Sequence, residues 1–104
     1  MKDRILSLIG FSKRAGMLAA GTNRVIDTIK FKKASLVILA SDISDNTYDK
    51  IFNLAKLNKV MVIKFSNIEE LSKISGEENK GVYSILDKKF SEPIIKLFET
   101  NDIK

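Results

Sequence analysis

The sequence predicts an α/β fold, a single three-layer α-β-α sandwich with a four-stranded mixed sheet that occupies residues 1–104. Helix-like and strand-like segments alternate along the chain, an order typical of α/β domains. The apolar runs Leu36–Ala40 and Val60–Ile63 show no alternation, as expected of strands buried on both faces of a sheet. With 104 residues, of which 44% are hydrophobic, the chain is long enough to form one core without disulfides or metals.

The first half of the chain reads as helix, strand, helix, strand. Apolar residues at helical spacing predict a first helix over residues 4–12. The short apolar segment 17–20, bracketed by glycines, predicts an edge strand. Thr22 is a suitable N-cap for a second helix over residues 22–32, whose lysines suit a helix C-terminus. Residues 36–40 then form a buried strand.

The second half repeats the pattern. A third helix is followed by a strand over residues 60–63, and Ser66–Glu69 has the spacing of a capping box that opens a fourth helix. Residues 76–81 form a polar turn, residues 82–86 a last strand, and Pro93 suits only the first turn of a closing helix. The side chains that we expect to face the core from these helices are Tyr48, Ile51, Phe52, Ala55, Ile68, Leu71, Ile74, Phe90, Ile94, Leu97 and Phe98.

The composition argues against an enzyme. The chain contains no histidine and no cysteine, which removes the commonest general base, the commonest metal ligand and the thiolate nucleophile. Gly16 and Gly21 have the spacing of a phosphate-binding loop, but Thr22 follows directly where that loop needs a lysine. Asp42, Asp45 and Asp49 leave open only a weak carboxylate magnesium site. We therefore expect no catalytic residue, no cofactor and no metal.

The chain also lacks the features of a membrane or exported protein. No apolar run is long enough to span a bilayer, and the N-terminus has no signal-peptide pattern. We expect a cytoplasmic monomer with no membrane partner.

The positive charge is concentrated in the first third of the chain. Residues 1–33 carry eight Lys and Arg against two Asp, whereas residues 34–104 carry ten basic and eleven acidic residues. Two interpretations remain open: a well-solvated surface, or a basic face for a phosphate backbone. The segment Gly21–Arg24 could serve the second, because a helix N-terminus offers free N–H groups to phosphate, but local sequence alone favours Asn23 as an ordinary residue of a helix's first turn. Asn23 could bind a purine edge, and Arg24 a phosphate or guanine.

Four segments together resemble the superfamily of ribosomal proteins seven-Ae and thirty-e, and especially its small bacterial members. The resemblance covers about residues 4–98 and rests on segments 8–21 (LIGFSKRAGMLAAG), 33–42 (KASLVILASD), 44–47 (SDNT) and 70–76 (ELSKISG). It implies an α-β-α sandwich that binds structured RNA, in particular a kink-turn with tandem sheared G·A pairs.

The resemblance also implies which residues contact RNA. The start of the second helix enters the widened groove, and the matching positions are Gly21, Thr22, Asn23, Arg24 and Asp27. The loop Gly76–Gly81 holds the flipped-out nucleotide, with Asn79 and Lys80 as its expected contacts. Ser41 and Asp42 match a pair that helps to hold the binding face. This mode agrees with the general preference of RNA-binding proteins for splayed bases and deformed shapes.

Several positions depart from the pattern that the resemblance implies. Arg24 stands where glutamate is frequent, and Asp27 stands where lysine is common. Lysines often found before the helix are replaced by Met17, Ala19 and Ala20, and Glu77 and Glu78 add negative charge to the second loop.

The sequence thus predicts a non-catalytic, ribosomal-protein-like RNA-binding protein. Its partner would be structured RNA, either rRNA or another kink-turn RNA, with the ribosome as one candidate assembly. The predicted RNA-binding residues are Gly21, Thr22, Asn23, Arg24, Lys13, Arg14, Asp42, Asn79 and Lys80, and Lys30 and Lys33 would add backbone electrostatics. The alternative is a protein-interaction module on the same fold that has lost specific RNA binding, which Asp27, Glu77 and Glu78 favour.

Overall fold

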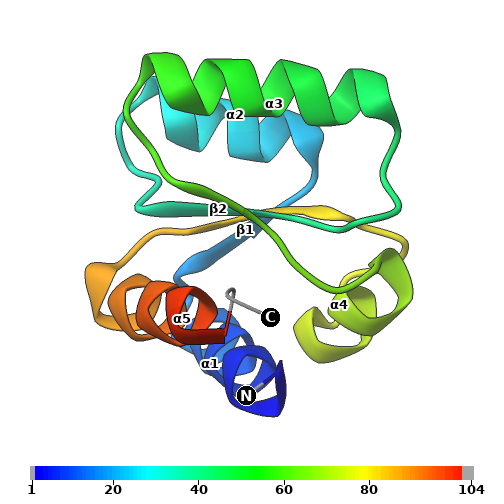
Figure 1. Ribbon diagram of the computed structural model, residues 1–104, viewed down its shortest axis with the longest axis vertical. Helices are drawn as coiled ribbons and strands as arrows, with labels where there is room; N and C mark the ends of the chain where they lie inside the picture. Colours follow the sequence, from blue (N-terminus) through cyan, green and yellow to red (C-terminus); the bar gives the residue numbers. More distant parts are fainter. Residues whose placement is uncertain (1, 102–104) are drawn as a thin grey trace.

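A computed structural model describes residues 2–101 as five helices around one sheet (Figure 1). In chain order the elements are α1 (Lys2–Arg14), β1 (Leu18–Ala20), α2 (Thr22–Lys30), β2 (Leu36–Leu39), α3 (Asp45–Leu57), β3 (Val62–Lys64), α4 (Ile68–Ser75), β4 (Val82–Ile85) and α5 (Lys88–Asn101). Within this part of the chain, no helix has the length and apolar character that crossing a membrane requires.

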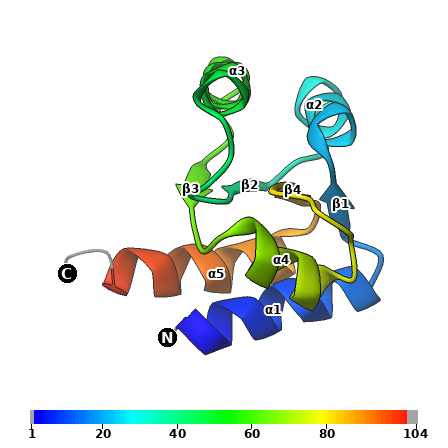
Figure 2. The same cartoon turned by 90° about the vertical axis from the view of Figure 1, so that its right-hand side faces the viewer.

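The sheet is mixed and has four strands in the order β1-β4-β2-β3. Strands β2 and β3 pair in parallel, whereas β4 runs antiparallel to both β1 and β2. Helices α2 and α3 cover one face of the sheet, and α1, α4 and α5 cover the other (Figure 2). The predicted three-layer α-β-α sandwich with a four-stranded mixed sheet is confirmed.

Strand β2 explains why the run Leu36–Ala40 lacks alternation. Leu36 and Ile38 belong to the core shared with α1, α4 and α5, while Val37 and Leu39 belong to the core shared with α2 and α3. All four side chains are fully buried. A strand with an apolar layer on both faces needs apolar residues at every position, which is the pattern that the sequence shows.

Several predicted boundaries are shifted. Helix α2 ends at Lys30 rather than Lys32, because Lys32 has a left-handed backbone with φ +61° that no helix accommodates. Strand β3 begins two residues later than predicted, at Val62. The predicted capping box is wrong by one residue. Ser66 has φ +63°, and Asn67 is the N-cap of α4, its side chain accepting a hydrogen bond from the Glu70 N–H at 2.8 Å.

Three predictions about residues in helices need correction, two about burial and one about position along the helix. Phe52 and Ile74 were expected in the core but lie at its margin, with 37% and 36% of their surface exposed. Helical periodicity identifies the inward stripe but not how far the neighbouring layer extends over it. Pro93 lies in the second turn of α5 and not in its first, so the helix continues across a residue that lacks a backbone donor.

An exposed ion pair joins the start of α1 to the start of α4. The Lys2 ammonium lies 2.7 Å from Oε1 of Glu70, and the Ser66 hydroxyl donates to the same oxygen. The Lys2 and Ser66 contacts lower the pKa of Glu70. A carboxylate with a lowered pKa stabilises the fold above its unfolded pKa and loses that contribution as the pH falls through its folded pKa.

We expect Glu70→Gln to lower the Tm slightly at pH 7 and not at pH 2. Thermal melts followed by circular dichroism measure the Tm, and equal shifts at both pH values would contradict this expectation. The effect is small because the pair is exposed.

Candidate nucleic-acid interface

Helix α2 begins without a side-chain cap, so the predicted N-cap at Thr22 is wrong: Gly21 occupies that position, and Thr22 is the first residue of the helix. Gly21 precedes it with φ +100°, a backbone conformation that favours glycine, and no side chain accepts a hydrogen bond from the first-turn amides as a cap. The Gly21 N–H donates to the Val82 carbonyl at 2.8 Å, which fixes the start of α2 against β4. Asn23 and Arg24, in the first turn, are exposed to solvent. The N–H groups of this turn are therefore open to a ligand.

Helices α3 and α4 begin differently. Ser44 caps α3 by accepting a hydrogen bond from the Thr47 N–H at 3.2 Å, and Asn67 caps α4. Both helices also carry acidic residues in their first turn, whereas α2 carries none. The positive end of the α2 dipole is thus left without a compensating group of its own, and such an end favours an anion.

The loop of residues 76–81 lies against this open helix start. The Lys80 side chain passes over Gly21, with its Nζ 3.9 Å from the position that a Cβ on Gly21 would occupy. An ammonium group therefore lies beside the positive end of a helix, an arrangement that an anion between them would stabilise. Gly21 and Gly81 are 60 residues apart in the sequence. The two segments that contain them, both implied for RNA binding by the resemblance, meet in the structure.

Side-chain hydroxyl groups hold this loop in place. Ser72 Oγ accepts from the Lys80 N–H at 3.1 Å and donates to the Lys80 carbonyl at 3.2 Å. The fully buried Tyr83 donates its hydroxyl to the Lys80 carbonyl at 3.1 Å and lies 3.0 Å from Ser75 Oγ. Asn79 has φ +56°, a left-handed conformation that asparagine tolerates better than most residues. The loop presents Lys80 on a fixed support.

Removing the Tyr83 hydroxyl should loosen this loop. We expect Tyr83→Phe to lower the free energy of unfolding by about 1 kcal/mol, since it removes one buried and one partly buried hydrogen bond and leaves Ser75 with fewer partners. Amide exchange in residues 76–81 should accelerate more than exchange in α3. Urea denaturation and hydrogen exchange measure the two effects, and Tyr48→Phe on α3 is the control. Uniformly faster exchange across both regions would contradict a local role.

Lys13 and Arg14, at the end of α1, have partners within the protein. The Lys13 ammonium donates to the Ser75 carbonyl and lies 3.1 Å from Oε2 of Glu77. The Arg14 guanidinium stacks over the Phe11 ring at 4.9 Å. Lys13 therefore ties α1 to the end of α4 and offsets the charge of Glu77. Direct contact of Lys13 and Arg14 with RNA stays a prediction.

Asp42 likewise makes an internal contact. Its Oδ1 accepts a hydrogen bond from the Ile68 N–H at 2.9 Å, which links the segment after β2 to the start of α4. Asp42 and Asn79 line one shallow hollow of about 430 Å³, together with side chains of α4. This contact fits the implied role of holding the binding face, and whether Asp42 touches RNA stays a prediction.

The structure separates Lys30 and Lys33 from this site. Helix α2 has nine residues, so its C-terminal end lies about 13 Å from its start. The two lysines therefore lie at the opposite end of α2 from Gly21. The predicted basic residues of the first third of the chain do not form one continuous surface, and those of the α2 C-terminus require a separate explanation.

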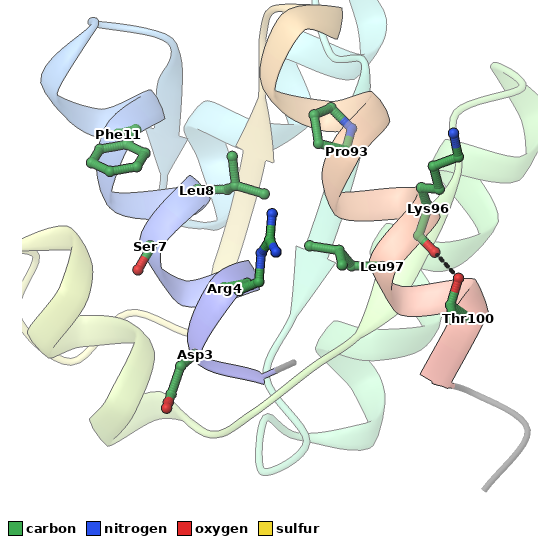
Figure 3. A pocket seen from close by; sticks show the side chains of 9 residues that line it. All are labelled: Asp3, Arg4, Ser7, Leu8, Phe11, Pro93, Lys96, Leu97 and Thr100. Atoms are coloured by element: carbon green, nitrogen blue, oxygen red, sulfur yellow. Dashed lines mark hydrogen bonds between the residues drawn. The ribbon is translucent and has the colours of Figure 1, made fainter.

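A larger hollow lies in the opposite layer, between α1 and α5 (Figure 3). Its volume is about 630 Å³, and Figure 3 shows Arg4 between the two helices, near Leu8 and Leu97. None of the predicted RNA-binding residues lines it. Sequence reasoning gave no signal for this hollow, because it depends on how α1 packs against α5.

The chain is similar to known proteins of one family. Residues 3–95 match the Ribosomal protein L7Ae/L30e/S12e/Gadd45 family. The chain is 30% identical to an RNA-binding protein YlxQ of Enterococcus faecium over 98 residues, which cover 94% of each chain. It is also 30% identical to the RNA-binding protein YlxQ of Bacillus subtilis over 92 residues, which cover 88% of this chain and 92% of that one.

Two solved structures have the same fold. A protein of unknown function from Bacillus halodurans superposes with a TM-score of 0.88 at 27% identity, covering 91% of this chain and 96% of the other. The 15.5kD RNA binding protein of Giardia lamblia superposes with a TM-score of 0.76 at 17% identity, covering 94% and 84%, and supports the fold alone. With the family match spanning nearly the whole chain, this protein belongs to the ribosomal protein L7Ae/L30e/S12e/Gadd45 family.

Proposed function

We propose that the protein is a non-catalytic RNA-binding protein that recognises structured, kink-turn-type RNA. Recognition would use the start of α2 and the loop of residues 76–81. The observation that carries the proposal is the position of the Lys80 ammonium beside the uncapped N-terminus of α2. Family membership and two relatives named RNA-binding proteins support it.

The chemistry of this surface suits a distorted RNA groove. The open N–H groups of α2 and the Lys80 ammonium would contact phosphates, as helix N-termini and lysines do in other phosphate sites. Asn23, exposed in the same turn, has an amide that donates and accepts, so it could pair with a purine edge. Such edges are accessible where mismatched or unpaired bases widen the groove.

The acidic residues near the site bear on the alternative, a protein-interaction module. Asp27 and Glu78 are exposed and would repel phosphate. Glu77, in contrast, is paired with Lys13, so most of its charge is compensated within the protein. This pairing removes part of the electrostatic argument against RNA binding and favours the RNA-binding function.

The test is binding to a kink-turn RNA and to the same duplex with its G·A pairs replaced by Watson–Crick pairs, at two salt concentrations. Tight binding to the kink-turn alone would support the proposal. Equal, strongly salt-dependent binding to both RNAs would leave only electrostatic binding. No binding to either RNA near physiological salt would contradict the proposal and favour the protein-interaction module. We further propose a monomer that meets its RNA in the cytoplasm.

A further inference from the structure

A second positively charged surface lies where α2 and α3 end. The strands before them, β1 and β2, run in the same direction, since both are antiparallel to β4. Both helices pack on the same face of the sheet, so they finish at the same side of the molecule, on the left in Figure 1. Gly21 and the start of α2 lie at the other side. We call the surface at the helix ends the helix-end surface, and its exposed residues are Lys30, Phe31, Lys32, Lys33, Lys56, Leu57 and Lys59.

The helix-end surface carries five lysines and no acidic residue of its own, and the nearest acidic residue along α2 is Asp27, one turn before Lys30. Segments 28–41 and 50–68 contain no acidic residue. The two ion pairs found between residues 2 and 101 join Lys2 to Glu70 and Lys13 to Glu77, and neither involves the helix-end surface. Asp87, which follows β4 at the same side, is succeeded by two lysines. The surface therefore has a strong local excess of cations.

Two of these lysines occupy backbone positions where glycine is usual. Lys32 and Lys59 have φ +61° and +60°, and each closes its helix through the same pair of hydrogen bonds. After α2, these bonds run from the Lys33 N–H to the Thr28 carbonyl at 2.8 Å and from the Lys32 N–H to the Ile29 carbonyl at 3.2 Å. This pattern is the Schellman motif, whose left-handed residue is most often glycine.

The other helices of the same chain show the contrast. The left-handed residues that close α1 and α4 are Gly16 and Gly76, each with φ +74°. Stabilising the helix dipole does not require lysine in the left-handed position, because Lys30 and Lys56 already lie in the last turns of α2 and α3. Lysine is thus present at both positions despite its conformational cost, and backbone outliers of this kind point to a function.

An aromatic ring accompanies these charges. Phe31 lies between Lys30 and Lys32 and exposes 70% of its surface, although a phenylalanine normally contributes to a core. Exposed aromatic rings among cations are the usual platform for unpaired bases of single-stranded RNA: the ring stacks on a base, and the lysines contact the neighbouring phosphates.

We propose that the helix-end surface is a second RNA-contact site, which binds single-stranded RNA flanking the structured element held at the start of α2. Phe31 stacks on an unpaired base, and Lys32 and Lys59 contact phosphates on either side of it. The inference rests on the proposed RNA-binding function. An RNA strand that leaves the binding site at the start of α2 reaches the helix-end surface by following α2 for about 13 Å.

The experiment compares two RNAs: a blunt-ended kink-turn duplex, and the same duplex carrying a single-stranded uridine tail at either end. The wild-type protein should bind the tailed RNA more tightly. The double variant Lys32→Gly/Lys59→Gly should lose part of this gain, because only the Phe31 stacking remains, and its salt slope on the tailed RNA should fall by about 1.4, or 0.7 for each lost contact. Phe31→Ala should weaken binding to the tailed RNA by about fivefold to a hundredfold, the range for loss of one stacked base.

A thermal melt separates this role from a structural one. The double glycine variant should melt a few degrees higher than wild type, because glycine suits the left-handed positions, so lost binding could not come from unfolding. Lys32→Arg/Lys59→Arg should keep the preference for the tail. The control Arg4→Gln/Lys96→Gln removes two exposed charges from the α1–α5 layer and should also keep it.

The outcomes distinguish the two proposals. If the wild type binds the blunt kink-turn but gains nothing from the tail, the second site is wrong and the first stands. Tail binding that depends on the two lysines, without any preference for the kink-turn, would support the helix-end surface and contradict the first site. A glycine variant that keeps the whole gain from the tail and the wild-type salt slope would overturn the second site.

Discussion

Asn23→Ala is expected to weaken binding to a kink-turn RNA by about 1–3 kcal/mol, the usual effect of losing one base-reading contact. The side chain is exposed in the first turn of α2, so its removal should leave the Tm nearly unchanged. Isothermal titration against the kink-turn and its Watson–Crick counterpart measures the effect. The loss should appear on the kink-turn only, because the Watson–Crick duplex offers no base edge in reach.

Asn46→Ala provides a matched control for this experiment. Asn46 is the second residue of α3, as Asn23 is the second residue of α2, and both are exposed. Helix α3, however, is capped by Ser44 and has Asp45 in its first turn. Asn46→Ala should therefore leave the affinity unchanged. Equal losses from both variants, or none from Asn23→Ala, would show that the start of α2 does not read the RNA.

Gly81→Ala is expected to lower the free energy of unfolding by about 1–3 kcal/mol, as overpacking of a well-filled core does. A Cβ at this position would lie 2.6 Å from Cγ2 of Ile43 and 2.8 Å from Cγ1 of Ile68. The Gly81 carbonyl also accepts a hydrogen bond from the Ala40 N–H at 2.8 Å, so the backbone cannot move away without breaking that bond. Urea denaturation measures the loss.

Gly10→Ala is the control for this substitution and should have the opposite sign. Gly10 is buried within α1, and an added Cβ would meet the Ile74 side chain at an ordinary 3.4 Å. Because alanine favours a helix interior over glycine by roughly 1 kcal/mol, the variant should be neutral or more stable than wild type. If both variants lose stability equally, the close contacts of Gly81 are not the cause.

The helix-end surface shows what sequence reasoning missed and why. Lys30 and Lys33 were expected to serve the same RNA surface as Gly21, whereas the structure places them at the other end of α2. Lys59 had no predicted role, because nothing in the sequence says that α3 ends beside α2. The segments KFKK and KLNK, which begin in the last turns of the two helices, are rich in lysine. That they form one surface can be inferred only when the parallel packing of α2 and α3 is known.

The sequence by itself determined the layers of this protein. Helical periodicity and two unbroken apolar runs predicted the order of helices and strands. A helix that is buried on one face repeats apolar residues every three or four positions, whereas a strand that is buried on both faces is apolar at every position. Residue types did not predict the uncapped start of α2, because Thr22 is a common N-cap residue, whereas the structure has Gly21 at the N-cap position and no side-chain cap. Local signals also failed at Ser66 and Lys32, because neither serine nor lysine is a residue type that indicates a left-handed backbone.

Only the tertiary structure decided which charges act together. It brought Lys80 to Gly21, paired Lys13 with Glu77, and placed Lys32 and Lys59 at the ends of two parallel helices, where neither forms an ion pair with any of residues 2–101. Charge in a sequence has no position in space, and Coulomb interactions depend on distances of a few ångströms. The sequence could therefore supply the residues of a binding surface, but the packing of helices on the sheet determined which of them face the same ligand.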